Sequence, residues 1–341
     1  MEESPSNKES KKEETLLIDQ NKKENSENRI LSKEKERNNI IICLSIALSI
    51  IILSSILAAN SAHKNKIKKK ELKNSEKDSS NLLYLTYYNS ELKEYKLFDS
   101  SENNISNYVK SMKIDGKKIK YIEKYKFPKI GEHKVEIILN AKISSLNQLF
   151  KNCDALINVD FSYFSSENIN NLAELFSGCT SLISANFTNF DTSNVKNMSN
   201  MFYNCYKLKN IDLNKFNTSS TIDMSGMFQN CEILENLNLS NFKGDEVLNI
   251  SSMFYKCESL QYLDLKNFDT QKVINMSSLF YNCSSLAYLD ISNFCHNNSE
   301  GYNNIFTNIG KEGIIIYRSN KFFLPYEEFF YWKKKDLSFI D

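Results

Sequence analysis

The amino-acid sequence predicts an α/β repeat solenoid built from stacked 26-residue turns. A phenylalanine stands three residues before each of six cysteines, and a leucine stands three residues after each. No insertion or deletion interrupts the series, and such a fixed period is typical of repeats that bury their apolar faces against their neighbours. The six cysteines follow one another at intervals of 26 residues: Cys153, Cys179, Cys205, Cys231, Cys257 and Cys283.

Each repeat is predicted to contain one short strand. Residues 260–265 end in alternating apolar and polar side chains, so Leu263 and Leu265 are expected to face the core while Asp264 faces outward. Equivalent strands of successive turns would pair in parallel, about 4.8 Å apart.

A short helix or 3₁₀ turn is predicted before each cysteine. In residues 247–257, Val247, Ile250, Met253 and Phe254 are spaced by three and four residues, which is typical of one buried helical face. Strand, loop, short helix and loop in every 26 residues together predict a leucine-rich-repeat-like solenoid over residues 144–306.

The chain before the array contains a predicted transmembrane helix. Residues 1–37 form a polar tail that is expected to be disordered, because few aliphatic residues are present to offset the chain entropy. Residues 40–59 hold no charged residue, and twenty residues at about 1.5 Å rise span a hydrocarbon core of about 30 Å. A basic linker over residues 60–81 follows. The alternative is a cleaved signal sequence, although its apolar core is usually shorter.

The same segments predict a single-pass membrane protein whose repeat domain is extracellular. Basic residues flank both sides of residues 40–59, so the positive-inside rule discriminates weakly between the two orientations. A short polar leader before a single span is the layout of a signal anchor. The alternative is an interaction scaffold that faces the cytosol and is anchored on an internal membrane.

Two further segments are predicted to cover the ends of the array. Residues 82–143 are rich in aromatic and β-branched residues, and Asp115-Gly116 between two alternating runs predicts a two-residue hairpin. A β-rich N-terminal cap is therefore expected there. Residues 307–341 depart from the repeat and are expected to form a C-terminal cap over the exposed end of the core.

Composition and motifs argue against nucleic-acid binding and catalysis. The net charge is +1 with 25% charged residues, so no basic field is available for nucleic acid. The three histidines lack a partner at a catalytic spacing, no nucleotide-binding glycine motif is present, and no cofactor is expected. The cysteines lack the close pairs of zinc sites and are expected to be buried as small apolar residues. A non-enzymatic protein is predicted.

The outward strand residues are the candidate ligand-binding positions. Alternation of Asp and Asn over the first five turns would reduce repulsion between stacked carboxylates. Tyr262 and Tyr288, two residues earlier in their strands, would add aromatic contacts for a protein or glycan ligand on a concave strand face. The alternative is a strand face that serves only solubility. The outward positions are Asp160, Asn186, Asp212, Asn238, Asp264 and Asp290.

The recurring phrase MFxxCxxLxxLDLxxFDTxxVxxM resembles the BspA-like leucine-rich-repeat surface proteins, in the branch with mycoplasma-lipoprotein-type 26-residue repeats. Residues 197–216 and 275–294 carry the resemblance best. It implies a membrane-anchored surface protein that displays its solenoid for recognition or adhesion, without enzymatic activity. The sequence departs from the phrase at Ser165-Ser166-Glu167 and at residues 242–246, where the loops are expected to be reshaped.

Overall fold

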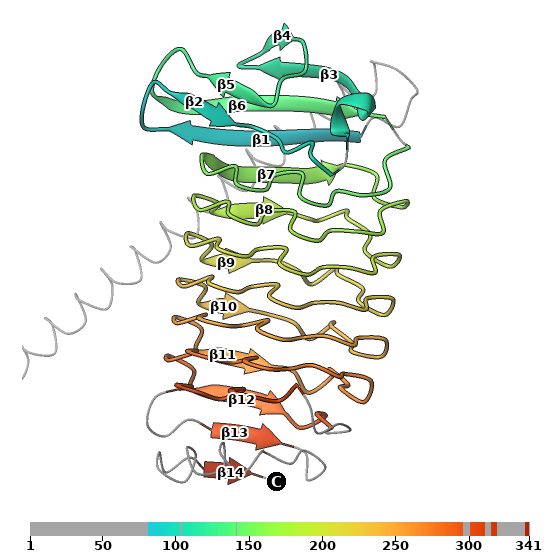
Figure 1. Ribbon diagram of the computed structural model, residues 1–341, viewed down its shortest axis with the longest axis vertical. Coiled ribbons are helices and arrows are strands. Elements are labelled where there is room, and N and C mark those ends of the chain that lie inside the picture. The colour runs from blue at the N-terminus through green and yellow to red at the C-terminus, as the bar shows by residue number, and fades with distance from the viewer. Residues whose placement is uncertain are drawn as a thin grey trace, which may run out of the picture. The chain divides into compact units, whose positions relative to one another are not determined.

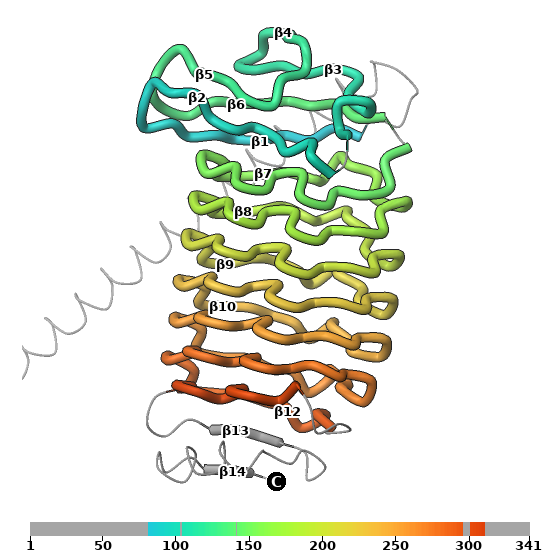
Figure 2. Tube along the Cα trace, viewed as in Figure 1, coloured from blue at the N-terminus to red at the C-terminus, as the bar shows by residue number. Residues whose placement is uncertain are grey.

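The computed structural model describes residues 81–102, 104–140, 142–295, 301–310, 315–318 and 338–340. These residues fall within one compact unit, Ser79–Asp341. Their chain winds into turns that follow one another along a single axis (Figure 1). The tube in Figure 2 shows each circuit of the repeat array lying beside the next.

One six-stranded sheet joins the N-terminal part of the described chain to the array. It comprises β1 (Asn81–Asn89), β3 (Val109–Ile114), β4 (Lys117–Ile119), β6 (Gly131–Leu139), β7 (Leu156–Tyr163) and β8 (Ser184–Asn186), in the order β4-β3-β6-β1-β7-β8. β1 pairs antiparallel with both β6 and β7, and β7 pairs in parallel with β8. β1 therefore covers the edge that β7, the first strand of the array, would otherwise leave unpaired.

Smaller elements complete this N-terminal part. β2 (Glu94–Lys96) pairs antiparallel with β5 (Lys124–Lys126), and a 3₁₀ helix, η1, spans Ile105–Tyr108. Asp115 and Gly116 connect β3 to β4 with φ angles of 48° and 79°, so the predicted two-residue hairpin is confirmed.

The second six-stranded sheet is the spine of the array. It comprises β9 (Asn210–Ile211), β10 (Asn236–Leu237), β11 (Tyr262–Asp264), β12 (Tyr288–Ile291), β13 (Ile315–Arg318) and β14 (Ser338–Ile340), all parallel. The register from β9 to β12 advances by one repeat at each step, which places Asn210, Asn236, Tyr262 and Tyr288 side by side. Leu263 and Leu265 are buried, as the strand prediction requires.

The prediction of an α/β fold is wrong, because the described part of the chain consists of strands and turns. Its only helical element is the four-residue η1. Residues 247–257, expected to be helical, hold a β-bridge at Asn249 followed by turns at residues 251–256. Ser252 and Lys256 have φ angles of 56° and 57°, in the left-handed region that a right-handed helix excludes.

Backbone hydrogen bonds explain why these turns replace a helix. The N–H of Ser252 donates to Ser277 O at 2.8 Å, and the N–H of Phe254 donates to Leu279 O at 3.0 Å, both in the next turn of the array. The N–H of Met253 instead donates locally, to Ile250 O at 3.2 Å. Val247 and the three other predicted core residues of this stretch are nonetheless buried. The apolar spacing therefore identified the buried face but not the backbone conformation.

The predicted transmembrane localisation also has to be corrected. None of the helices in the described ranges has the length and apolar character needed to cross a membrane. This finding overturns the assignment of a single-pass protein with an extracellular repeat domain. The predicted tail, span and most of the linker, residues 1–37, 40–59 and 60–80, lie outside the described residues, as do most residues of the expected C-terminal cap.

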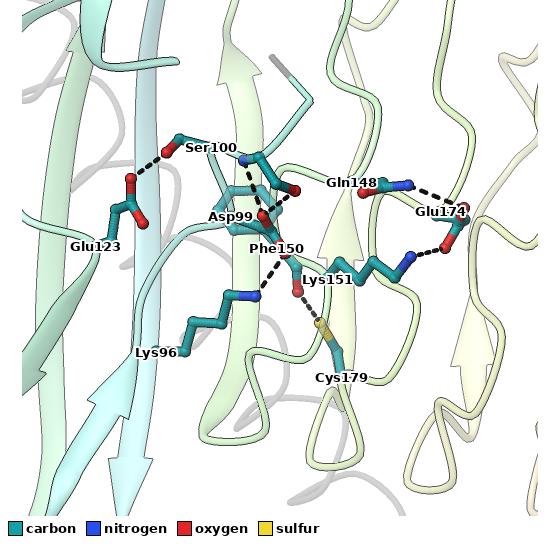
Figure 3. Close-up of polar contacts among 10 residues, drawn as sticks. Lys96, Asp99, Ser100, Glu123, Gln148, Phe150, Lys151, Glu174 and Cys179 are labelled. Atoms are coloured by element: carbon teal, nitrogen blue, oxygen red, sulfur yellow. Dashed lines mark hydrogen bonds and ion pairs between the residues drawn. The ribbon is translucent and has the colours of Figure 1, made fainter. Parts of the chain in front are cut away.

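The core of the array is built from two ladders that run from turn to turn. Phenylalanine rings stack at centroid distances of 5.5 to 5.8 Å from Phe150 to Phe306. Beside them, the cysteine thiols from Cys179 to Cys283 each donate to the carbonyl of the phenylalanine 29 residues earlier, at 2.9 to 3.3 Å. Figure 3 shows the first of these bonds, from Cys179 to Phe150. The six array cysteines are free and fully buried, as predicted.

A row of buried hydroxyls fastens the loops that follow the strands. Thr218 Oγ1 donates to Lys243 O at 2.9 Å and accepts the Lys243 N–H at 2.7 Å, and Thr192 and Thr270 bond their next turns in the same way. Ser166, in the first atypical loop, still accepts the N–H of the next turn. Gly244 occupies the threonine position in the other atypical loop, and it lacks the side-chain hydroxyl that would bond the next turn.

Candidate binding surface on the strand face

The predicted site residues form one row on the outward side of β7 to β12, which we call the Asx row. It contains Asp160, Asn186, Asp212, Asn238, Asp264 and Asp290. The parallel pairings Asp160 with Asn186 and Asp264 with Asp290 show that its members occupy equivalent positions in successive turns. Asn186, Asp212 and Asn238 are exposed, Asp160 and Asp264 are half-buried, and Asp290 is buried. The structure therefore brings the row together but leaves Asp290 little access to a ligand.

Every member of the Asx row also has a structural role. Its Oδ1 accepts the backbone N–H of the residue two positions later, at 2.9 to 3.0 Å. Such Asx turns redirect the chain at the end of a strand, and the short side chains of Asp and Asn are well suited to this bond. The recurrence of Asp and Asn is therefore explained by chain geometry, and ligand contacts are left to their second oxygen or nitrogen atoms.

Charges along the Asx row are offset locally. Asn186 Nδ2 donates to Asp160 Oδ1 at 3.0 Å, across neighbouring turns. Asp264 and Asp290 are two aspartates in neighbouring turns. Asp264 Oδ2 pairs with Lys266 Nζ at 2.9 Å, and Asp290 accepts a 3.4 Å hydrogen bond from the hydroxyl of Tyr288. An exposed ion pair such as Lys266–Asp264 contributes little to stability but reduces repulsion between the carboxylates.

A second row, two residues earlier in each strand, carries the predicted tyrosines; we call it the leading row. Tyr262 and Tyr288 stack with ring centroids 4.4 Å apart and planes inclined by 10°. Tyr262 is 52% exposed. Burial, followed by the negative charge of Asp290, raises the pKa of Tyr288 to about 12. The leading row contains Asn158, Ser184, Asn210, Asn236, Tyr262 and Tyr288.

Two hollows lie along these rows. One of about 370 Å³ lies between the turns of β10 and β11 and is lined by residues that include Asn236, Asn238, Ser240, Tyr262 and Asp264. Another, of about 300 Å³, lies between the turns of β8 and β9 and has no aromatic ring from the leading row. The first hollow therefore offers the richer set of contacts.

The loop edge beside the strand face carries an amide row that the sequence analysis missed. Asn189 Nδ2 donates to Ser162 O at 2.8 Å, Asn267 Nδ2 donates to Ser240 O at 3.0 Å, and Asn241 Nδ2 donates to Asn214 O. Asn241 and Asn267 line a polar hollow of about 660 Å³. The sequence signal for this row is the recurring Asn-Phe dipeptide, in which the asparagine directly precedes a buried phenylalanine.

A polar cluster at the junction of β2, β5 and the first turns is occupied by internal contacts. Asp99 pairs with Lys96 at 2.5 Å and accepts the N–H of Ser101 at 3.0 Å. Burial alone would raise the pKa of Asp99, but the hydrogen bonds from Lys96 and Ser101 hold it below its ordinary value. Figure 3 shows the Lys96–Asp99 pair and the neighbouring pairs Ser100–Glu123, Gln148–Glu174 and Lys151–Glu174. The backbone N–H of Asp99 donates to Leu149 O at 2.8 Å, and this bond joins the cluster to the first turn of the array.

Within the described ranges, no three His, Cys, Asp or Glu side chains come together in a way that could hold a metal ion. The thiols offer no alternative chemistry, since burial raises the pKa of each array cysteine, that of Cys283 to about 12. The strand face thus presents amides, carboxylates and phenols, which suit recognition by hydrogen bonding and stacking.

Comparison with known protein families identifies a family whose model covers the repeat array. The model of a family described as a Mycoplasma protein of unknown function, DUF285, matches residues 125–236 and 207–313, which together span more than half of the chain. No curated protein and no solved structure matches the chain. The chain therefore belongs to the DUF285 family of Mycoplasma proteins of unknown function.

Proposed function

We propose that this chain is a non-enzymatic recognition protein whose strand face binds a protein or glycan ligand. The observation that carries the proposal is the stacked Tyr262–Tyr288 pair, which stands beside a 370 Å³ hollow on an otherwise polar face. Tyrosine is enriched where proteins bind ligands, because it supplies a large apolar ring with a hydroxyl at its edge.

We also propose that, within this family, the chain is related to the BspA-like leucine-rich-repeat proteins. The 26-residue period, with phenylalanine, cysteine, leucine and Asp or Asn in fixed register, supports this kinship, and DUF285 membership is compatible with it. In such solenoids the parallel strands present a continuous surface, so one ligand can contact several turns at once.

The experiment compares two tyrosine pairs of the same turns. The fluorescently labelled chain is applied to arrays of defined oligosaccharides and of purified proteins. In the test variant, Tyr262→Ala/Tyr288→Ala, the strand-face stack is removed. In the matched control, Tyr255→Ala/Tyr281→Ala, a second stacked pair is removed, whose ring centroids lie 4.8 Å apart in the turn region before the cysteines.

We expect the strand-face variant to lose at least about tenfold in affinity for any ligand found, because a buried aromatic contact is worth about 2 kcal/mol. The control should bind as the unaltered chain does, and circular dichroism should show both variants folded. The proposal would be refuted by an equal loss of affinity in both variants or by full affinity in the strand-face variant. It would also be refuted if neither the oligosaccharides nor the purified proteins contained a ligand.

A further inference from the structure

The hollow between β10 and β11 has the shape of a ledge. In the leading row, the ring of Tyr262 lies between Asn236 of the preceding turn and Tyr288 of the following turn. Tyr288 covers one face of the Tyr262 ring by stacking. The other face looks toward Asn236, whose side chain is much shorter than a tyrosine. The side chains of the row therefore become longer between Asn236 and Tyr262, and one face of the Tyr262 ring is left open above the floor of the hollow.

Polar groups surround the open ring face, and Leu237 and Leu239 complete the lining of the hollow. The amide of Asn238 and the hydroxyl of Ser240 line the hollow with Asn236, and the carboxylate of Asp264 lies on the tyrosine side. Its volume of about 370 Å³ falls within the roughly 300–1,000 Å³ of small-molecule sites. An aromatic platform beside amide and carboxylate groups matches a sugar ring, which has an apolar C–H face and hydroxyl groups around its edge. Those C–H groups can pack on the negative face of the tyrosine ring.

From this arrangement we propose that Tyr262 is the platform of a binding subsite for a neutral sugar residue of a glycan. The inference rests on the proposed recognition function and assigns a ligand class to its site. The sugar ring stacks on the open face of Tyr262, and its hydroxyl groups bond to Asn236, Asn238 and Asp264. None of the residues that line the hollow is cationic, so the subsite has no partner for the charge of an anionic sugar.

Two features of the strand face favour a glycan over a polypeptide. Apart from aromatic residues, which suit both kinds of ligand, interfaces between proteins are enriched in Met and Arg and depleted in Asp and Ser. Neither the Asx row nor the leading row contains Met, Arg or an aliphatic residue. In addition, β10 and β11 are each paired on both edges, so a peptide cannot bind here by adding a strand.

Saturation-transfer NMR on the full chain tests this subsite with maltotriose, cellotriose and chitotriose as probes, each at about 10 mM. We expect at least one probe to receive saturation on the C–H protons of one ring face. Tyr262→Ala should reduce the affinity for that probe at least about tenfold, whereas Tyr262→Phe, which keeps the ring, should change it less than about threefold. Tyr255→Ala is the matched control and should bind as the unaltered chain does.

The outcomes separate this inference from the proposed function. Absence of saturation transfer for all three probes, or binding that survives Tyr262→Ala, overturns the sugar subsite. If screening of the purified proteins then shows a protein ligand whose binding depends on Tyr262 and Tyr288, the proposed function stands without the sugar subsite. If no ligand found in the oligosaccharide or protein screen depends on the strand face, the proposed function fails, whatever the trisaccharides do.

Discussion

Restoring the repeat consensus at Gly244 should destabilise the protein. Threonine occupies this position in three other turns, where its hydroxyl bonds the following loop, so the sequence pattern alone favours Gly244→Thr as a stabilising change. A Cβ atom placed on Gly244 would lie 1.8 Å from Asp269 O and 3.0 Å from the ring of Phe268. The loop of the next turn therefore occupies the space that a side chain needs.

The magnitude follows from the nature of the clash. Asp269 O is a backbone atom in a loop bonded to its neighbours, so it can move away only if two turns separate locally. Overpacking of this kind costs about 1–3 kcal/mol. The new hydroxyl would recover about 1 kcal/mol at most if it found its bonds. We expect Gly244→Thr and Gly244→Ala both to lower the free energy of unfolding, by about 1–2 kcal/mol.

Urea unfolding followed by circular dichroism measures the effect as a shift in the transition midpoint. Thr218→Val is the companion variant: it removes a buried hydroxyl that makes two bonds to Lys243, and it should cost about 2 kcal/mol. Thr218→Ser keeps the hydroxyl and should cost less. A midpoint raised by Gly244→Thr would show that the close approach at this turn is not a constraint, and the reasoning would be refuted.

Three further predictions concern the core and the junction. The array cysteines should not react with a thiol reagent at neutral pH until urea unfolds the array, because burial raises their pKa; a fast reaction of Cys231 in the native state would contradict their burial. Phe228→Ala should cost about 3–5 kcal/mol in urea unfolding, since Phe228 is fully buried between Phe202 and Phe254, and a loss below about 1 kcal/mol would mean that the stack collapses around the gap. The lowered pKa of Asp99 contributes stability above its unfolded pKa of about 4 that is lost as the pH falls through its folded value. The melting temperature of Asp99→Asn should therefore fall less between pH 7 and pH 3 than that of the unaltered chain, and equal falls would exclude this contribution.

The sequence was sufficient for the repeat, its register and its buried residues, because each depends on a period that the residues display directly. Helix prediction failed at residues 247–257 for a physical reason. Consecutive turns with left-handed residues place every third or fourth side chain on one face, as a helix does. Ser252 and Lys256 carry no strong signal for a positive φ, and the inter-turn hydrogen bonds that favour it involve residues 25 positions away.

The candidate site was predictable in part. Alternation within residues 260–265 placed Asp264 and Tyr262 on the outward side, where the structure has them. The Asx turns were not foreseen, because they depend on the direction that the chain takes after each strand. The ledge at Tyr262 could not be derived from one repeat either, since it arises from the difference in side-chain length between neighbouring turns.

The thiol-to-carbonyl bonds across 29 residues have a consequence for how this protein can change in length. Each such bond, like each stacked phenylalanine pair, joins only adjacent turns. Deleting one complete 26-residue module would bring together two turns whose donors, acceptors and rings occupy equivalent places. The array can therefore be shortened or extended by whole modules without redesign of its cross-section, whereas the loss of a single residue would put every ladder beyond it out of phase.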